Sequence, residues 1–306
     1  MPPRERDDQA FTFGALHADR PWPRLESLDC GPFPCRDVTG PDGVFEDPRT
    51  LLHVTPGFDS SRPFVIVVFL HGWCATLTQR IGGKRHHVVE TYRLVEQVDA
   101  SSLNAVVIAP QLARDADTDI VETPGHPGNF ARPGAFARFL DEATARIAAQ
   151  LHDDVERYRP APVLLMSFSG GYRAAAKALT IGGIADRLIG FVGLDTIYGE
   201  ADAFASWFAA RYQHAFLAAV YTGGREHAYA SAGPTLELAQ SLAGMQRSDL
   251  RVRTSLPMRL KPGSASFEHV GDPDLHLDLV AAGWPGFDQP VRRLLARLPG
   301  FPRPGS

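Results

Sequence analysis

The chain has 306 residues, of which 44% are hydrophobic and 22% are charged, and its formal net charge is −4. This length suits one large α/β domain, and the composition is that of a globular protein that can form a core. Because the net charge is negative and the basic residues are scattered, we expect neither nucleic acid nor an anionic membrane surface as a partner.

The amino-terminal segment, residues 1–50, is rich in Pro, Gly and Asp, so we expect it to be irregular and to supply edge strands at most. Its first ten residues are polar and charged, and no apolar run is long enough to cross a bilayer. This pattern predicts a cytoplasmic protein without excluding export. Cys30 and Cys35 are near enough in sequence to form a small disulfide in an exported protein, and the sequence leaves that open.

From residue 51 onward, short apolar runs alternate with segments of helical period. The runs expected to form strands are 64–70, 105–110, 163–167, 188–194, 216–222 and 250–257, and the run 51–54 is a candidate edge strand. Amphipathic helices are expected at 88–98, 136–151, 172–179, 201–210, 235–243 and 277–298. Continuous apolar strands are buried on both faces, which predicts an α/β fold with a mostly parallel central sheet covered by helices on both faces. We expect one domain over residues 51–300, a tail at 301–306, and a long loop at 118–133 as a candidate lid.

A strand, a turn of small residues and a helix meet at Ser169, in the sequence Ser167-Phe168-Ser169-Gly170-Gly171. A nucleophilic serine on so sharp a bend needs small residues two positions to either side. Ser169 meets that condition, whereas Ser167 does not, because Leu165 would occupy the crowded place. The sequence therefore predicts Ser169 as a nucleophile, and a Gly-rich turn without chemistry is the alternative.

A second motif, His71-Gly72-Trp73, ends the earlier apolar run at 64–70. With this motif, the order of elements and the serine turn, the chain resembles the α/β-hydrolase superfamily over roughly residues 50–300. The resemblance implies the α/β-hydrolase fold and two oxyanion N–H donors, on Trp73 and Gly170. Two departures leave the substrate class open: Ser167 stands where G-x-S-x-G has its first glycine, and His71-Gly72-Trp73-Cys74 differs from the His-Gly-Gly-Gly of many lipases.

The resemblance also implies the chain order serine, acid, histidine. We expect His276 to be the base, since it directly precedes a helical segment, with His269 as the alternative. Asp195, at the end of the run 188–194, is the expected acid, and Glu226, one strand later, is the alternative. The candidates for a substrate pocket are His71, Gly72, Phe168, Tyr172 and Tyr198.

These residues predict a serine hydrolase that transfers an acyl group to water, with a carboxylic ester as the expected substrate. An amidase, peptidase or thioesterase on the same fold is an alternative, and so is a binding protein that keeps the fold without chemistry. We expect no cofactor and no metal, because the chain has no nucleotide-binding motif and His86-His87 lack a carboxylate at ligand spacing. The expected partner is a small-molecule acyl substrate, and the oligomeric state stays open.

Overall fold

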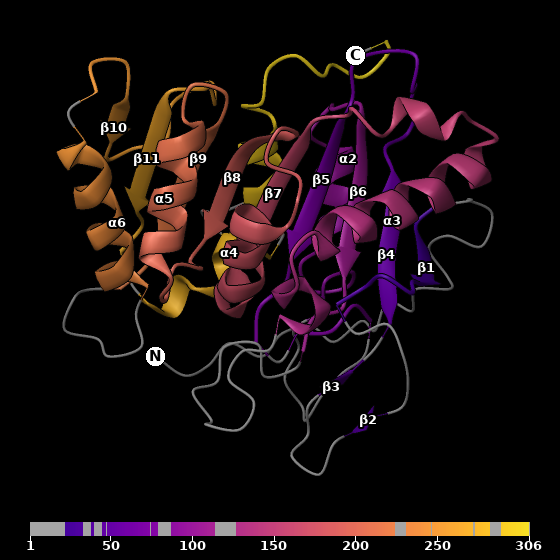
Figure 1. The fold of residues 1–306 in the computed structure, drawn as a ribbon, viewed down its shortest axis with the longest axis horizontal. Coiled ribbons are helices and arrows are strands. Elements are labelled where there is room, and N and C mark those ends of the chain that lie inside the picture. The colour runs from indigo at the N-terminus through magenta and orange to yellow at the C-terminus, as the bar shows by residue number, and fades with distance from the viewer. Residues whose placement is uncertain are drawn as a thin grey trace.

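The computed structural model describes residues 22–32, 38–39, 45–46, 48–73, 75–78, 87–113, 127–223, 231–245, 247–271, 273–281 and 289–305. Its centre is a nine-stranded sheet in the order β1-β4-β6-β5-β7-β8-β9-β11-β10 (Figure 1). These strands are β1 (Arg24–Ser27), β4 (Arg49–Val54), β5 (Val65–Leu70), β6 (Ala105–Pro110), β7 (Val163–Phe168), β8 (Leu188–Leu194), β9 (Phe216–Tyr221), β10 (Arg251–Arg253) and β11 (Ser264–His269). β4 is antiparallel to both of its neighbours, β1 and β6, and the pairs from β6 to β10 are all parallel. A separate hairpin joins β2 (Val38–Thr39) to β3 (Phe45–Glu46).

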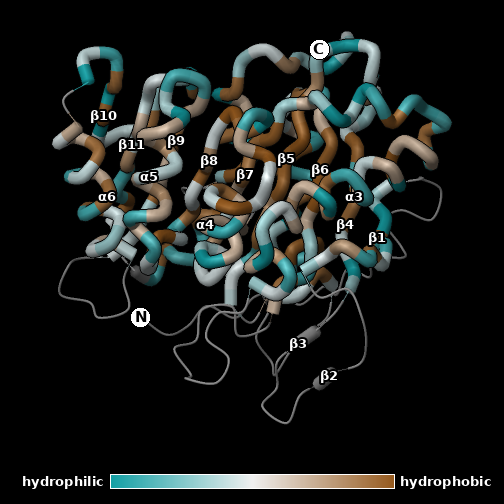
Figure 2. The backbone as a smooth tube through the Cα atoms, in the orientation of Figure 1, coloured by the Kyte–Doolittle hydropathy of each residue, from teal (hydrophilic) through white to brown (hydrophobic). Residues whose placement is uncertain are grey.

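Different helices bury the two faces of the sheet. Helices α3 (Ala135–Leu151), α4 (Tyr172–Ile181), α5 (Ala201–Arg211) and α6 (Ala232–Gly244) cover one face, and α2 (Leu94–Asp99) and α7 (Pro290–Leu295) cover the other. Successive side chains of a strand point to opposite faces. In β5, Val68 accordingly packs with the first group of helices and Val67 with the second, and the whole strand is buried. The central strands are the most hydrophobic part of the backbone in Figure 2.

The predicted α/β class and its mostly parallel, doubly covered sheet are confirmed. The runs 105–110 and 188–194 are strands with the predicted bounds, and α3 begins one residue before the predicted helix and ends where it does. β1 lies within residues 1–50 and is an edge strand of the main sheet, whereas β4, which contains the run 51–54 expected at an edge, is an inner strand between β1 and β6. The division of the chain at residue 50 stays a prediction.

Three predicted elements are wrong in extent. The predicted strand at 250–257 is a strand only in β10. The last strand of the chain, β11, was not predicted, because its small and polar residues do not form an apolar run. The predicted helix at 88–98 is helical only in α2, since residues 87–93 form turns. The predicted helix at 277–298 contains η5 (Leu277–Leu279) and α7, with residues 282–288 outside the described part. Within the predicted loop 118–133, the described residues include η1 (Gly128–Ala131), and the rest of the lid prediction falls mostly outside the described residues.

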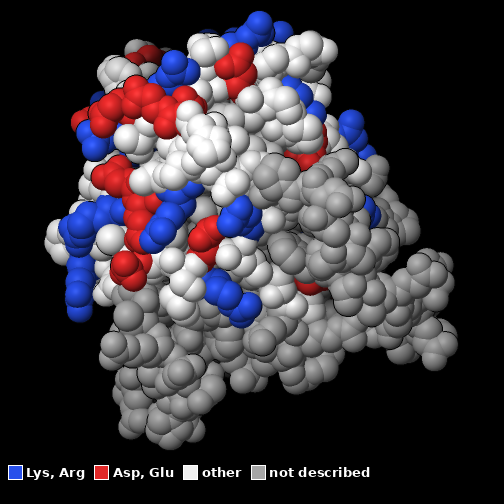
Figure 3. All heavy atoms as spheres, turned by 90° about the vertical axis from the view of Figure 1, so that its right-hand side faces the viewer, with Lys and Arg blue, Asp and Glu red and all other residues white. Residues whose placement is uncertain are grey.

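The molecular face toward the β1 end of the sheet carries acidic and basic side chains mixed together (Figure 3). Arg146 and Glu142, four positions apart on α3, form an ion pair at 3.7 Å, and Arg157 and Asp153 form another at 3.7 Å in the segment that follows. Opposite charges at this spacing are neighbours on a helix surface. None of the helices in the described part of the chain has the length and apolar character needed to span a membrane.

Candidate active site

Ser169 occupies a strained turn at the carboxyl end of β7. It opens the short helix η3 (Ser169–Gly171), which leads directly into α4, and its φ of 51° is in the left-handed region that few residues other than glycine adopt. Such a conformation costs about 1–3 kcal/mol and persists only where the surroundings enforce it. The buried strand β7 before Ser169 and the helix α4 after it hold the backbone in this conformation. The turn thereby places the serine side chain at the edge of the sheet.

Close approach of the backbone explains the small residues around Ser169. A Cβ atom at Gly171 would lie 2.7 Å from the carbonyl oxygen of Leu70, and one at Gly72 would lie 2.6 Å from the Cβ of Ser169. Neither contact is tolerable, so both positions need glycine. The crowding expected around the serine turn is therefore present in the structure.

Ser167 has a structural contact that the sequence did not indicate. The hydroxyl of Thr196 donates to the carbonyl oxygen of Ser169 at 2.7 Å, which uses its only proton. Ser167 therefore donates its own proton to the hydroxyl oxygen of Thr196, across 2.8 Å. This chain of two hydrogen bonds ties the serine turn to the loop that follows β8, and it gives a reason for a serine at position 167.

His71 supports the loop after β5 from beneath. Its ring is fully buried, its Nδ1 lies 2.9 Å from the carbonyl oxygen of Gly72, and its Nε2 lies 2.8 Å from the backbone nitrogen of Leu112 and 2.8 Å from Nε2 of Gln111. Burial lowers the pKa of His71 to about 4, so the ring is neutral near pH 7, with Nδ1 donating and Nε2 accepting. The prediction that His71 lines a substrate pocket is wrong, because the side chain has no exposed surface.

Trp73, the next residue but one, is 42% exposed, while Gly170 is buried in the serine turn. Gly72 lies between His71 and Trp73 and packs directly against Ser169. The loop after β5 thus packs directly on the serine turn.

His276 approaches Ser169 from a distant part of the chain. It lies between η4 (Pro273–Leu275) and η5, and its Nε2 is 2.9 Å from the hydroxyl oxygen of Ser169. The ring of Phe168 stacks on the imidazole, with centroids 4.6 Å apart and an angle of 27° between the planes. This stacking fixes the plane of the ring, so that the Nε2 lone pair can point at the serine.

Asp195 lies on the other side of the imidazole, at the end of β8. Its Oδ2 is 2.6 Å from Nδ1 of His276, and its side chain is almost fully buried. Because an ionised carboxylate only accepts hydrogen bonds, Nδ1 of His276 carries the proton and Nε2 is left to accept one from Ser169. The three side chains therefore form a continuous hydrogen-bonded series.

Two residues that sequence reasoning missed complete the surroundings of Asp195. Thr222 donates its backbone N–H at 2.9 Å and its hydroxyl at 2.5 Å, and the buried hydroxyl of Ser231 donates to Oδ1. Burial alone would raise the pKa of Asp195, but the hydrogen bond and charge of His276, with the bonds from Ser231 and Thr222, lower it overall. Thr222 directly follows β9, the neighbour of β8, so strand pairing is the signal that could have revealed it.

A mostly parallel sheet with β4 antiparallel, a left-handed serine between strand and helix, and an acid and a histidine that follow in that order define a known architecture. The chain has the α/β-hydrolase fold. This conclusion rests on strand order, on the serine turn and on the chain order of the three polar residues.

No family model matches the chain, and no curated protein matches it either. Among solved structures, the chain is similar to an uncharacterised protein from Capnocytophaga ochracea DSM 7271, with 11% identity, a TM-score of 0.48, and coverage of 89% of this chain and 64% of that one. It is also similar to a thermostable esterase, with 12% identity, a TM-score of 0.41 and coverage of 82% and 58%. It is similar as well to esterase 2 of Thermogutta terrifontis, with 10% identity, a TM-score of 0.46, and coverage of 90% of this chain and 91% of that one. The chain thus spans less than two thirds of the first two of these proteins.

The alternative base, His269, does not join this series. It ends β11, and its Nε2 lies 2.9 Å from the carbonyl oxygen of Gly223 while its ring lies against Tyr221, with centroids 5.1 Å apart. The α/β-hydrolase sheet thus directs His269 to the loop after β9, and it brings His276 to Ser169. The alternative acid, Glu226, lies outside the described residues.

Tyr198 lies beside the imidazole of His276, and Tyr172 lies behind Tyr198. The hydroxyl of Tyr198 is 3.5 Å from Nδ1 of His276, at the limit of a hydrogen bond, and its ring is 6.3 Å from that of Tyr172. Tyr172 is largely buried and its hydroxyl accepts a bond from Arg173 at 3.0 Å. Tyr198 is the more accessible of the two and is the better candidate for contact with a substrate.

No group of three or more His, Cys, Asp or Glu side chains among the described residues is arranged to hold a metal ion. Cys30 is a free thiol in this structure, and burial together with the nearby carboxylate of Glu142 raises its pKa. Cys35, the partner that the sequence left open for a disulfide, falls outside the described residues.

Proposed function

We propose that this protein is a serine hydrolase that cleaves a carboxylic ester or a related acyl bond through an acyl-enzyme. The observation that carries the proposal is the hydrogen-bonded series from the hydroxyl of Ser169 through His276 to Asp195, with contacts of 2.9 Å and 2.6 Å. These distances lie in the range that proton transfer needs. The series lies at the carboxyl edge of the sheet, where α/β folds bind their ligands.

The reaction begins when Nε2 of His276 takes the proton of Ser169 as its oxygen attacks the acyl carbonyl carbon. A neutral imidazole becomes a cation in this step, and the adjacent carboxylate of Asp195 stabilises that cation. The lowered pKa of Asp195 supports this role, since the carboxylate stays ionised well into the acid range. Removal of a triad acid costs such enzymes about 10⁴-fold in kcat.

Negative charge then develops on the carbonyl oxygen of the substrate. The backbone N–H groups of Trp73 and Gly170 are the donors we propose for it, because their two segments flank Ser169. One such donor contributes about 10²- to 10³-fold to kcat in related chemistry. The tetrahedral intermediate collapses, His276 returns the proton to the leaving group, and water repeats the sequence to release the acid.

A fluorophosphonate probe tests the proposal directly, because it reacts with an activated serine to form a stable adduct. We expect the wild-type protein to be labelled and Ser169→Ala to remain unlabelled. Ser167→Ala is the matched control, since it removes the neighbouring serine of the same motif and should still label. Labelling of Ser169→Ala at the wild-type rate, or none of the wild type, would contradict the proposal and favour a binding protein with this fold.

The type of bond is tested by a panel of activated esters, thioesters and aminoacyl amides with the same acyl group, compared by kcat/KM. We expect the esters to be the best substrates. The reason is chemical: an alkoxide or phenoxide leaves without prior protonation more easily than an amine does, and the described site offers His276 alone as the proton donor. A higher kcat/KM for the amides would assign the protein to the amidases or peptidases instead.

A further inference from the structure

Thr196, which directly follows Asp195, connects the proposed acid to the proposed nucleophile through its side chain. Its hydroxyl donates to the carbonyl oxygen of Ser169 at 2.7 Å and accepts from the hydroxyl of Ser167 at 2.8 Å. Thr196 is 1% exposed and Ser167 is fully buried, so water does not compete for these bonds. One threonine side chain thus joins the loop that carries the acid to the turn that carries the serine.

This bridge lies where the pairing between β7 and β8 ends. The last paired residues of the two strands are Phe168 and Leu194, and Ser169 and Asp195 come directly after them. Both of these residues have a left-handed backbone, with φ of 51° and 44°. Such conformations are strained in residues other than glycine and persist only where the surroundings enforce them. The hydrogen bond from Thr196 continues the link between the strands beyond their last pair.

Two glycines leave room for the bridge. A Cβ atom at Gly193 would lie 3.0 Å from the methyl carbon of Thr196, and one at Gly171 would lie 2.7 Å from the hydroxyl oxygen of Ser167. Both side chains therefore fit closely against the backbone around them. A β-branched side chain such as threonine also has few rotamers. The direction of the Thr196 hydroxyl is set by this packing as well as by its hydrogen bonds.

The position of His276 shows why the bridge matters for the reaction. Its ring lies between Ser169 and Asp195, 2.9 Å from the hydroxyl of the first and 2.6 Å from the carboxylate of the second. Both contacts form at once only if the serine turn and the acid keep a fixed separation. A displacement of about 1 Å can cost an enzyme about 10²-fold in rate. Thr196 is covalently bonded to one residue and hydrogen-bonded to the other, so it holds that separation.

We propose that Thr196 is a positioning residue, which holds the serine turn against the acid so that His276 contacts both. The proposal rests on the proposed hydrolase function and deepens it, since Thr196 acts through Ser169 rather than on the substrate. Because the bridge serves the chemical step, loss of its hydroxyl should lower kcat and leave KM unchanged.

Thr196→Val tests the proposal, because it keeps the branched shape of the side chain and removes the hydroxyl. We expect kcat for an activated ester to fall about tenfold or more, while KM changes less than about twofold. Thr196→Ser keeps the hydroxyl and loses the methyl group, so kcat should stay within about threefold of the wild type although the packing is poorer. An equal loss of kcat in both variants would assign the effect to packing and overturn the proposal.

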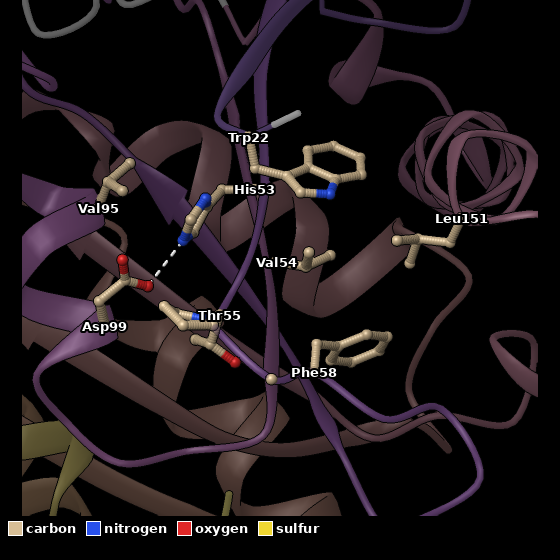
Figure 4. Close-up of a pocket in the computed structure, with 10 residues that line it drawn as sticks. Trp22, His53, Val54, Thr55, Phe58, Val95, Asp99 and Leu151 are labelled. Carbon is tan, nitrogen blue, oxygen red and sulfur yellow. Dashed lines mark hydrogen bonds and ion pairs between the residues drawn. The ribbon is translucent and has the colours of Figure 1, made fainter. Parts of the chain in front are cut away.

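Thr55→Val is the matched control. Thr55 is also 1% exposed, and its hydroxyl likewise makes two bonds, donating to the carbonyl of Ala105 at 3.3 Å and accepting from its N–H at 3.1 Å. It follows β4 at the edge of the sheet opposite to Ser169, and Figure 4 shows it beside a cavity there. We expect the control to lower Tm about as much as Thr196→Val and to leave kcat unchanged. An equal fall of kcat in the two variants would overturn the proposal.

Nuclear magnetic resonance tests the bridge without any substrate. Ser169-Gly170 is the only Ser-Gly pair in the sequence, so a protein with ¹³C in its serine carbonyls and ¹⁵N in its glycines gives a single carbonyl–amide correlation. That carbonyl is the one that accepts from Thr196. Loss of a hydrogen bond moves a carbonyl carbon upfield, so we expect an upfield shift in Thr196→Val and none in Thr196→Ser or Thr55→Val. An unchanged carbonyl in Thr196→Val would overturn the bridge itself.

Failure of this proposal is distinct from failure of the hydrolase function. An active wild-type protein whose kcat is the same in Thr196→Val would overturn the role of Thr196 alone. A wild-type protein that neither cleaves an ester nor reacts with the fluorophosphonate would overturn the hydrolase function, and the catalytic role of Thr196 with it.

Discussion

Nε2 of His276 lies 2.9 Å from the hydroxyl oxygen of Ser169, although 107 positions separate the two residues in the chain. The imidazole is held in this position from two sides, by the stacked ring of Phe168 and by the carboxylate of Asp195. His269, which is only seven positions away from His276, is bonded instead to the carbonyl oxygen of Gly223.

The first prediction separates these two histidines. We expect His276→Ala to lower kcat for an activated ester by about 10⁴-fold or more, because the serine loses its base. His269→Ala removes an equally large side chain from the same region and should change kcat less than about tenfold, since its contacts lie outside the proposed series. Steady-state kinetics of the two purified variants measure the difference. A loss of activity in His269→Ala alone would show that the base is misassigned.

The second prediction concerns Ser231, which supports the proposed acid. Ser231→Ala removes a hydrogen bond to the buried carboxylate of Asp195 and should lower the free energy of unfolding at pH 7 by about 2 kcal/mol. The folded pKa of Asp195 lies below its unfolded value, so its contribution is present at neutral pH and disappears as the pH falls through the folded pKa. Without the Ser231 donor the folded pKa rises toward the unfolded value, so the stability that is lost between these two pKa values as the pH falls should be smaller than in the wild type.

Denaturant unfolding from about pH 7 down to about pH 2, which extends below the unfolded pKa of an Asp, measures this effect. Ser264→Ala is the control, because its hydroxyl also makes a hydrogen bond, at 2.6 Å, but to the backbone carbonyl of Lys261 and far from any carboxylate named above. We expect the control to change the free energy of unfolding by a similar amount at every pH. The same dependence on pH in both variants would remove Asp195 from the explanation.

The third prediction tests the crowding at the serine turn. In Gly171→Ala the new Cβ would meet the backbone oxygen of Leu70 at 2.7 Å, and because a backbone atom cannot rotate away, we expect a loss of about 2 kcal/mol or more in the free energy of unfolding. Gly233→Ala, near the start of α6, places its Cβ where nothing lies within 4 Å. That variant should be neutral or more stable by up to about 1 kcal/mol. Thermal unfolding distinguishes the two, and equal stability would refute the proposed packing.

The fourth prediction follows from the buried ring of His71. Its pKa of about 4 lies below the unfolded value of about 6.5, so between these pH values the unfolded chain binds a proton that the folded protein does not. The free energy of unfolding should therefore decrease as the pH falls from about 6.5 to about 4, by about 3 kcal/mol from this group. In His71→Gln this part of the pH dependence should be absent.

Nitrogen chemical shifts of the imidazole measure the same property in the wild-type protein without any substitution. We expect the His71 ring to remain neutral down to about pH 4, with the proton on Nδ1 and the hydrogen bond from Leu112 at Nε2. Titration of His71 near pH 6.5 would mean that the loop after β5 is open to solvent.

The sequence by itself determined the local features of this protein. β6 and β8 follow from continuous apolar runs, because a strand buried on both faces requires them. The turn at Ser169 was predicted from its own run of small residues, although part of the crowding that requires glycine at position 171 comes from Leu70 and His71 at the end of β5. β11 was missed because a strand of small and polar residues has no apolar run to reveal it.

Only the tertiary structure decided which distant side chains meet. His276 and His269 both follow β9 and look alike in sequence, and the difference between them is the path of a few loop residues after β11, which no periodic pattern encodes. The donors to Asp195 depend in the same way on the closure of loops. Short-range sterics fix the shape of a turn, whereas contacts across a hundred residues depend on the packing of the whole sheet.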